Sequence, residues 1–396
     1  MPTSNAQSTR ADTLLDRARA MRPMLRDTAA HAKANGRVSQ DVVDAFQDAE
    51  FFKLLVPGKL GGIDGSFTDY VRLIAELTKG DTAAGWVYMI TGYLTGTAAA
   101  LPPPAEAAAI FADSAVVCCG VNAMTGTAKR VNGGYSVSGE WGWASGCHNA
   151  NWFLGGVLIE EDSAAEPEPA FCFLPMAQAS IKNSWRVAAM KGTGSDTVVV
   201  QDIFVPEGRV VSLRDRDLAE KTFDANLGGL ARFPIGVTFA LGISGAILGM
   251  ADAIQDIVVS DIGRKAITHW NFAKGTDSAT VLHKVGEAAM QIDSAWLHVL
   301  RSCQEMEAIC AVRPMTMQER AKGRCDAAHA AEMCRRAADT LVSLAGASAF
   351  ADTSLVNQYW NDLSMSSRHA QLNSHLHYEV EGRALCGLDP RLSPFI

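Results

Sequence analysis

The chain has 396 residues, of which 48% are hydrophobic and 20% charged, and its formal net charge is −8 at pH 7. This composition is typical of a globular protein of two or three domains and excludes a disordered chain or a coiled coil. The acidic balance argues against nucleic acid or an anionic membrane as a partner. The start of the chain lacks the apolar core of a secretory signal, and no apolar run reaches the length of about 18 residues that a membrane span requires. The nine cysteines form no C-x-x-C pair. We therefore expect a cytoplasmic protein with reduced thiols.

Residues 1–115 are predicted to form an N-terminal helical domain. Apolar residues recur at helical spacing, first from Leu14 to Met21 and again through DYVRLIAELTKGDTAAGWVYMITGYLTG, which begins at Asp69. Between them, VPGKLGGIDGSF has the glycine and proline content of a loop.

Residues 116–225 are predicted to form a small antiparallel β domain, because short segments rich in valine, isoleucine and aromatics alternate with glycines. Within RVNGGYSVSGEWGWASGCHNANW, the Asn-Gly-Gly tripeptide indicates a hairpin turn and the next residues alternate as in a strand. If the strand continues, Trp141, Trp143 and Ser145 project from one face. Two indoles and a hydroxyl in a row suit a flat heteroaromatic ligand, although both tryptophans would also suit the core of a barrel.

Residues 226–396 are predicted to form a bundle of four long, alanine-rich helices. Before this region, KGTGSDTVVVQDIFVP contains Gly192-Thr193-Gly194, which suggests a dinucleotide-binding fingerprint. The third glycine is missing, and a strand follows where a helix should begin, so we reject that interpretation.

Several of these segments resemble the acyl-CoA dehydrogenase superfamily. Gly139 to Ser145 reads G-x-W-x-W-x-S and is similar to the flavin-contacting strand of that superfamily, more closely to the flavin-dependent monooxygenases built on the same fold. The Pro57-x-x-x-Gly-Gly loop, the KGTGSDTVVVQDIFVP strand and the order of the three regions extend the resemblance over nearly the whole chain. It implies an α+β, mostly α fold with an N-terminal helical domain, a central antiparallel β-barrel and a C-terminal four-helix bundle. A homotetramer is implied as well.

The resemblance also implies roles for individual residues at a flavin site. Trp143 matches the tryptophan beside the isoalloxazine ring, and Ser145 matches the catalytic hydroxyl at flavin N5. Trp141, which stands where the dehydrogenases often have lysine, is predicted to contact the cofactor. Arg264 matches an arginine that reaches the flavin phosphate of a neighbouring subunit. Gly346 to Phe350 matches a glycine segment that approaches the cofactor across that interface, although a glycine here would serve equally well as a helix cap.

Trp86 and Tyr93 are predicted to line the substrate pocket, because the helix around Gly85-Trp86 forms its wall in the family. A place in the core would suit Trp86 as well. Phenol hydroxylases of the family often carry a histidine about eight residues after this Gly-Trp, where this chain has Gly92-Tyr93-Leu94. That departure argues against a simple phenol and favours a flatter ring such as an indole.

His369 is predicted to take the place of the catalytic acid. Counting forward from Asp362, the position of the dehydrogenases' glutamate base falls on or next to His369, whereas Glu379 and Glu381 come about ten residues too late. In the hydroxylase branch a histidine at this place acts as the base for the substrate. An imidazole suits this role because its unperturbed pKa is near 6.5. The spacing of His375 and His377 does not predict a metal site, since residues two apart on a helix diverge.

Taken together, the resemblance implies a flavin-dependent monooxygenase that hydroxylates an aromatic or indolic ring through a C4a-hydroperoxyflavin, with O2 as co-substrate. Reduced FAD or FMN would come from a separate NAD(P)H-dependent reductase, because this chain offers no nicotinamide fingerprint. One alternative is an acyl-CoA dehydrogenase-type flavoenzyme acting on a thioester, which requires Glu379 or Glu381 over the flavin. Another is a flavin-binding scaffold or sensor without catalysis.

Overall fold

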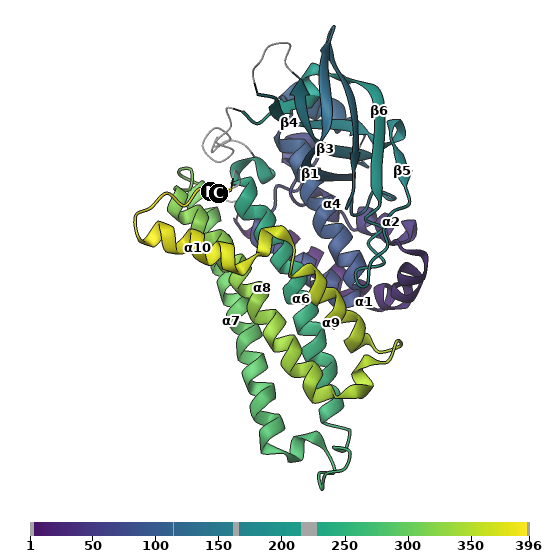
Figure 1. Ribbon diagram of the computed structural model, residues 1–396, viewed down its shortest axis with the longest axis vertical. Coiled ribbons are helices and arrows are strands. Elements are labelled where there is room, and N and C mark those ends of the chain that lie inside the picture. Colours follow the sequence, from purple (N-terminus) through teal and green to yellow (C-terminus); the bar gives the residue numbers. More distant parts are fainter. Residues whose placement is uncertain (1–3, 114, 161–165, 215–227, 394–396) are drawn as a thin grey trace.

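The computed structural model describes residues 4–113, 115–160, 166–214 and 228–393, with side chains from residue 13 onward. Helices form both ends of the chain and a sheet lies between them in sequence (Figure 1). The N-terminal helices are α1 (Ser4–Asn35), α2 (Gln40–Asp48), α3 (Phe67–Gly80), α4 (Thr82–Ala100) and α5 (Pro104–Ile110). Helix α4 is buried along almost its entire length. It is apolar on every side, as expected of a helix surrounded by protein.

The sheet follows with strands β1 (Cys118–Val131), β2 (Gly134–Trp141), β3 (Trp152–Glu160), β4 (Glu168–Pro175), β5 (Ser180–Lys182), β6 (Thr197–Pro206) and β7 (Val210–Ser212). Their order is β5-β6-β2-β1-β3-β4-β7. The predicted hairpin joins β1 to β2, and Gly133 in its turn has a φ of +80°. All neighbouring strands are antiparallel except β1 and β3, which are parallel. The sheet is therefore mixed where the sequence predicted an antiparallel barrel.

The C-terminal region consists of α6 (Ile235–Ile262), α7 (Ala279–Cys310), α8 (Met317–Ala345), α9 (Leu355–Ser366) and α10 (Ser374–Leu385). Helices α6, α7 and α8 are the long members of the bundle (Figure 1). Two shorter helices, α9 and α10, occupy the place of the fourth, and a short turn, η8 (Ala370–Leu372), lies between them. The predicted mostly helical fold with an acyl-CoA dehydrogenase-like order of regions is confirmed.

Helix α6 is long and apolar enough to cross a membrane by composition alone. However, 89% of its most apolar 18-residue stretch is buried inside the protein. It packs against α3, α8 and α9. Its apolar character is explained by its central position in the core.

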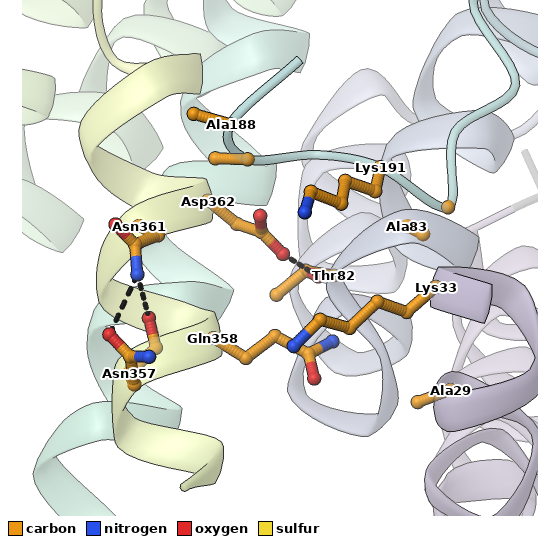
Figure 2. Close-up of a pocket in the computed structure, with 12 residues that line it drawn as sticks. Ala29, Lys33, Thr82, Ala83, Ala188, Lys191, Asn357, Gln358, Asn361 and Asp362 are labelled. Atoms are coloured by element: carbon orange, nitrogen blue, oxygen red, sulfur yellow. Dashed lines mark hydrogen bonds between the residues drawn. The ribbon is translucent and has the colours of Figure 1, made fainter. Parts of the chain in front are cut away.

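Asp362 on α9 connects all three regions of the chain. Its carboxylate accepts hydrogen bonds from Thr82 Oγ1 at the start of α4 and from the backbone N–H of Met190 in the loop before β6, both at 2.5 Å. Figure 2 shows this carboxylate beside a small pocket of about 50 Å³, with the side chains of Lys33 and Lys191 close by. Burial raises the pKa of Asp362, although both hydrogen bonds and the two lysines act in the opposite direction.

Candidate active site

A cavity of about 670 Å³ lies where the N-terminal helices, the sheet and the bundle meet. Its walls come from α4, β1, the loop after β2, the loop before β6, α6, the end of α9 and the segment that joins α9 to α10. Strand β1 contributes residues 120–123 to the wall. The register between β1 and β3 is irregular next to these residues, and such an irregularity changes the local direction of a strand. The lining is mostly apolar with a few hydroxyls and amides, one imidazole and one guanidinium. Such a wall is typical of a site for a small organic ligand.

Trp141 lies outside this cavity. Strand β2 ends at Trp141, whose indole is fully buried in the core of the sheet, 5.3 Å from the ring of Phe153 between centroids. Its Nε1–H donates to the backbone oxygen of Gly156 at 2.8 Å. The expectation that Trp141, Trp143 and Ser145 share one face is therefore wrong, and so is the cofactor contact predicted for Trp141. The strand alternation stops before it reaches Trp143.

Trp143 lines the cavity and is 68% exposed. Its φ of +67° lies in the left-handed region, which costs a residue with a side chain about 1 kcal/mol and turns the indole away from the core of the sheet. Trp185 packs edge to face on it, with 4.9 Å between ring centroids. The backbone of Trp185 is held by Asp196 Oδ1, and the second oxygen of Asp196 contacts His148 Nε2 at 2.7 Å. A large indole is thus fixed in an exposed position, where it can stack on a flat ring.

Ser145 lies deeper in the cavity and is almost fully buried. Its Oγ accepts a hydrogen bond from Trp86 Nε1 at 3.2 Å and lies 2.7 Å from the hydroxyl of Ser195. The next residue, Gly146, has a φ of +77°, and a Cβ there would come within 2.8 Å of the Thr91 side chain on α4. Glycine is therefore needed for the loop to lie close enough to α4 for Ser145 to reach Trp86.

His369 lies in the break between α9 and α10, where it is partly buried and lines the cavity. Its ring centroid is 6.2 Å from Trp86 and 5.9 Å from Phe239. The backbone N–H of Gln371 donates to His369 Nδ1 at 3.2 Å. In the neutral ring Nδ1 is therefore the acceptor, and the proton is on Nε2.

Burial lowers the pKa of His369 to about 4. The unperturbed value near 6.5 does not apply to an imidazole in this apolar surrounding. At neutral pH the imidazole is therefore uncharged, with its single N–H on Nε2.

Helix α4 presents one face to the cavity. Trp86, Ile90 and Leu94 line it, since a spacing of four residues returns side chains to the same side of a helix. Tyr93 points elsewhere: it is fully buried, and its hydroxyl contacts Thr238 Oγ1 at 2.9 Å and donates to the backbone oxygen of Ile235 at 3.0 Å. The predicted substrate contact of Tyr93 is therefore wrong, because its hydroxyl is already bonded within the core.

The residues expected to serve a neighbouring subunit lie outside the cavity of their own chain. Arg264 follows the end of α6, and its guanidinium pairs with Asp261 at 2.9 Å. Gly346 ends α8 with a φ of +72°, and the exposed Phe350 packs on Trp360. Their role in another subunit's site stays a prediction.

No aspartate or glutamate is among the described residues that line the cavity. Glu379 and Glu381, both on α10, do not belong to its lining. His375 and His377 both lie on α10, and His369 precedes that helix. Among the described residues, no cluster of histidine, cysteine and carboxylate side chains is arranged to hold a metal ion.

Thr193, Ser195, Trp185 and Phe239 line the cavity and were not identified from the sequence as site residues. The first two belong to KGTGSDT, which the sequence argument treated only as a family segment. The density of small hydroxyl residues there was a usable signal. Trp185 and Phe239 carry no local motif, so only the folded chain brings them to the site.

Two family descriptions and several characterised proteins match this chain. The acyl-CoA dehydrogenase N-terminal domain matches residues 11–101, and the acyl-CoA dehydrogenase C-terminal domain matches residues 241–374. The flavin-dependent monooxygenase oxygenase subunit HsaA of Rhodococcus jostii is 29% identical over 378 residues, which cover 94% of this chain and 98% of the relative. The oxygenase component of the FADH(2)-dependent resorcinol hydroxylase of a Rhizobium species is 27% identical over 390 residues, which cover 96% of this chain and 95% of the relative. The solved structure of XiaF from Streptomyces in complex with FADH2 and glycerol superposes with a TM-score of 0.94 at 26% identity over 99% of this chain and 100% of that one.

The fold and the cavity define a flavoenzyme of the acyl-CoA dehydrogenase type, whose cavity is lined by an imidazole and by no described carboxylate. The chain belongs to the flavin-dependent monooxygenases of this superfamily, as the oxygenase component of a two-component system. Reduced flavin is its cofactor and dioxygen its co-substrate, as predicted from the sequence.

Proposed function

We propose that this oxygenase hydroxylates an aromatic ring that already carries an oxygen substituent, and that His369 holds this oxygen through Nε2–H. The observation that carries the proposal is the hydrogen bond from the Gln371 backbone to Nδ1, which leaves Nε2–H as the donor of a side chain that lines the cavity. A phenolic or phenolate oxygen accepts such a hydrogen bond, whereas an indole N–H is itself a donor and would be mismatched.

The relatives include enzymes named for each of these two substrate classes. They include a resorcinol hydroxylase and a p-hydroxyphenylacetate 3-hydroxylase, whose substrates carry phenolic oxygens, and an indole-3-acetate monooxygenase. The sequence argument favoured an indole because α4 has no histidine near Tyr93. The polarity of His369 favours the oxygen-bearing ring.

The residues present fit a bound flavin. The volume of about 670 Å³ is within the range of small-molecule sites, and the exposed indole of Trp143 is fixed for stacking. When bound, reduced flavin supplies the electrons that activate dioxygen for transfer of one oxygen atom to the ring. Trp86, Ile90 and Phe239 form an apolar wall that excludes water from the reacting groups. We take FAD as the natural form, because two of the relatives are named with FADH2, and an NAD(P)H-dependent reductase as its source.

The experiment that tests the proposal compares His369→Gln with His369→Ala. The glutamine amide retains an N–H donor at about the position of Nε2, so it should keep a substantial part of the hydroxylation of a phenolic substrate. The alanine variant should lose about 1.5–3 kcal/mol of interaction with the ring oxygen, or roughly 10- to 100-fold in turnover. Product is measured by chromatography with reduced flavin supplied chemically. If both variants are equally inactive, His369 acts as a base; if an indole is the better substrate of the wild type, the proposed class is wrong.

We also propose that the chain assembles as a homotetramer and works in the cytoplasm. Leu282, Met290 and Leu297 on α7 are 50%, 62% and 63% exposed. Spacings of seven and eight residues bring them to one side of the helix, and an exposed apolar stripe of this kind supports self-association. In such an assembly the guanidinium of Arg264 would exchange its pairing with Asp261 for the flavin phosphate in a neighbouring cavity. All nine cysteines are free thiols, which supports a reducing compartment.

A further inference from the structure

We propose that Trp86, Ser195 and Thr193 fix the direction of the Ser145 hydroxyl, so that Ser145 presents a lone pair and not a hydrogen to the ligand. A site polarised in this way binds reduced flavin, which carries hydrogen at N5, more tightly than oxidised flavin, whose N5 carries a lone pair. The three residues are positioning residues. This inference rests on the proposed flavin site, in which Ser145 faces N5.

A continuous chain of hydrogen bonds connects these side chains across the wall of the cavity. Trp86 Nε1 is 3.2 Å from Ser145 Oγ, which is 2.7 Å from Ser195 Oγ. Ser195 Oγ is 2.7 Å from Thr193 Oγ1, which is 2.9 Å from the backbone oxygen of Met190. All of the hydroxyl and indole members line the cavity and are buried.

The Met190 carbonyl at one end determines the direction of this chain, and the Trp86 N–H at the other end occupies one lone pair of Ser145. An indole N–H can only donate, and a backbone carbonyl can only accept. Thr193 must therefore give its hydrogen to Met190 and accept from Ser195, and Ser195 in turn must accept the hydrogen of Ser145. Ser145 also accepts from Trp86, so its hydrogen and one lone pair are used. The second lone pair is what remains for a ligand.

Reversing the chain is costly in this geometry. If Ser145 donated its hydrogen to a ligand, the hydroxyls of Ser195 and Thr193 would have to turn as well. Thr193 Oγ1 would then face the Met190 oxygen at 2.9 Å without a hydrogen between them. In a buried site, such a lone-pair contact forfeits one hydrogen bond and adds repulsion.

The accepting end is itself held rigidly. The Met190 oxygen also accepts from Trp185 Nε1 at 3.1 Å, and the Met190 N–H donates to Asp362. Met190 has a φ of +56°, a strained value for a residue with a side chain, which the surrounding hydrogen bonds maintain. The carbonyl therefore stays aimed at Thr193, and the direction of the chain is built into the fold.

The test measures the dissociation constants of oxidised flavin and of reduced flavin, the latter under anaerobic conditions, by fluorescence or absorbance titration. In Ser195→Ala the hydrogen of Ser145 is released and can meet the N5 lone pair of oxidised flavin. We expect the preference for reduced flavin to fall about tenfold, mainly because oxidised flavin binds more tightly. Thr193→Val should act in the same direction, and Thr193→Ser, which keeps the hydroxyl, should restore the wild-type preference.

A double variant separates this effect from a general disturbance of the wall. In a Ser145→Ala background, Ser195→Ala should leave the preference unchanged, since no hydroxyl remains to be oriented. If Ser195→Ala alters the preference equally with and without Ser145, or in neither case, the inference is overturned while the flavin site stands. If the wild type binds flavin in neither redox state, the proposed function itself fails. Circular dichroism of each variant confirms that it is folded.

Discussion

Asp362 offers a sharp test of how the three regions are joined beside the active site. Asp362→Ala removes the acceptor of two hydrogen bonds, from the Thr82 hydroxyl and from the Met190 N–H, and both donors are buried. A buried polar group left without a partner costs roughly 1–3 kcal/mol, so the loss in the free energy of unfolding should be about 2–6 kcal/mol. Because the same bond holds Met190, the preference for reduced flavin should also fall.

Asp362→Asn is the matched control. The amide oxygen can still accept from Met190, and the amide nitrogen can donate to the Thr82 hydroxyl oxygen. Burial raises the pKa of Asp362, so the folded protein disfavours its charged form, and removal of the charge should cost less than about 1 kcal/mol. By linkage, a carboxyl group whose pKa is raised in the folded state loses its stabilising contribution as pH rises, and this dependence should disappear in the variant.

The assay is urea denaturation followed by far-ultraviolet circular dichroism, with the slope of the transition compared among the three proteins. An alanine variant within about 1 kcal/mol of the wild type would refute the reasoning that the two donors depend on Asp362. An asparagine variant as unstable as the alanine variant would show that the charge beside Lys33 and Lys191 matters more than the hydrogen bonds.

Three further predictions concern the tryptophans, the histidine and the surface of α7. Trp143→Ala should keep the stability of the fold but weaken flavin binding about tenfold in a titration, whereas Trp141→Ala should lose about 3–5 kcal/mol of stability, because only Trp141 is in the core. Burial lowers the pKa of His369 to about 4, so between about pH 6.5 and 4 the unfolded chain binds more protons and stability falls as pH falls. The pH dependence of stability in this range should be smaller in His369→Gln than in the wild type. Comparing the variant with the wild type cancels the opposite contribution of Asp81, whose pKa burial raises to about 7. Leu297→Glu should reduce the oligomer mass in analytical ultracentrifugation, and an unchanged mass would place the interface elsewhere.

The sequence by itself determined the order of helices, sheet and bundle, because apolar residues recur at helical or strand spacing within each region. It also located Trp143, Ser145 and His369, since each lies in a short segment that resembles the superfamily. The absence of a carboxylate at the position of His369 separated the monooxygenases from the dehydrogenases. These are local properties, and a local pattern is sufficient to reveal them.

Only the tertiary structure decided how these residues act. Strand alternation could not foresee that β2 ends at Trp141 and that the φ of Trp143 turns its indole into the cavity. The hydrogen-bond chain through Ser145 joins residues 50 and 59 positions apart in sequence, and no motif contains such a relation. Likewise, only the fold shows that the Gln371 amide donates to His369 Nδ1 and that burial lowers the pKa of this imidazole. Proton location and pKa depend on which groups the fold brings within a few ångströms and on how much water it leaves there, so they are properties of the folded chain.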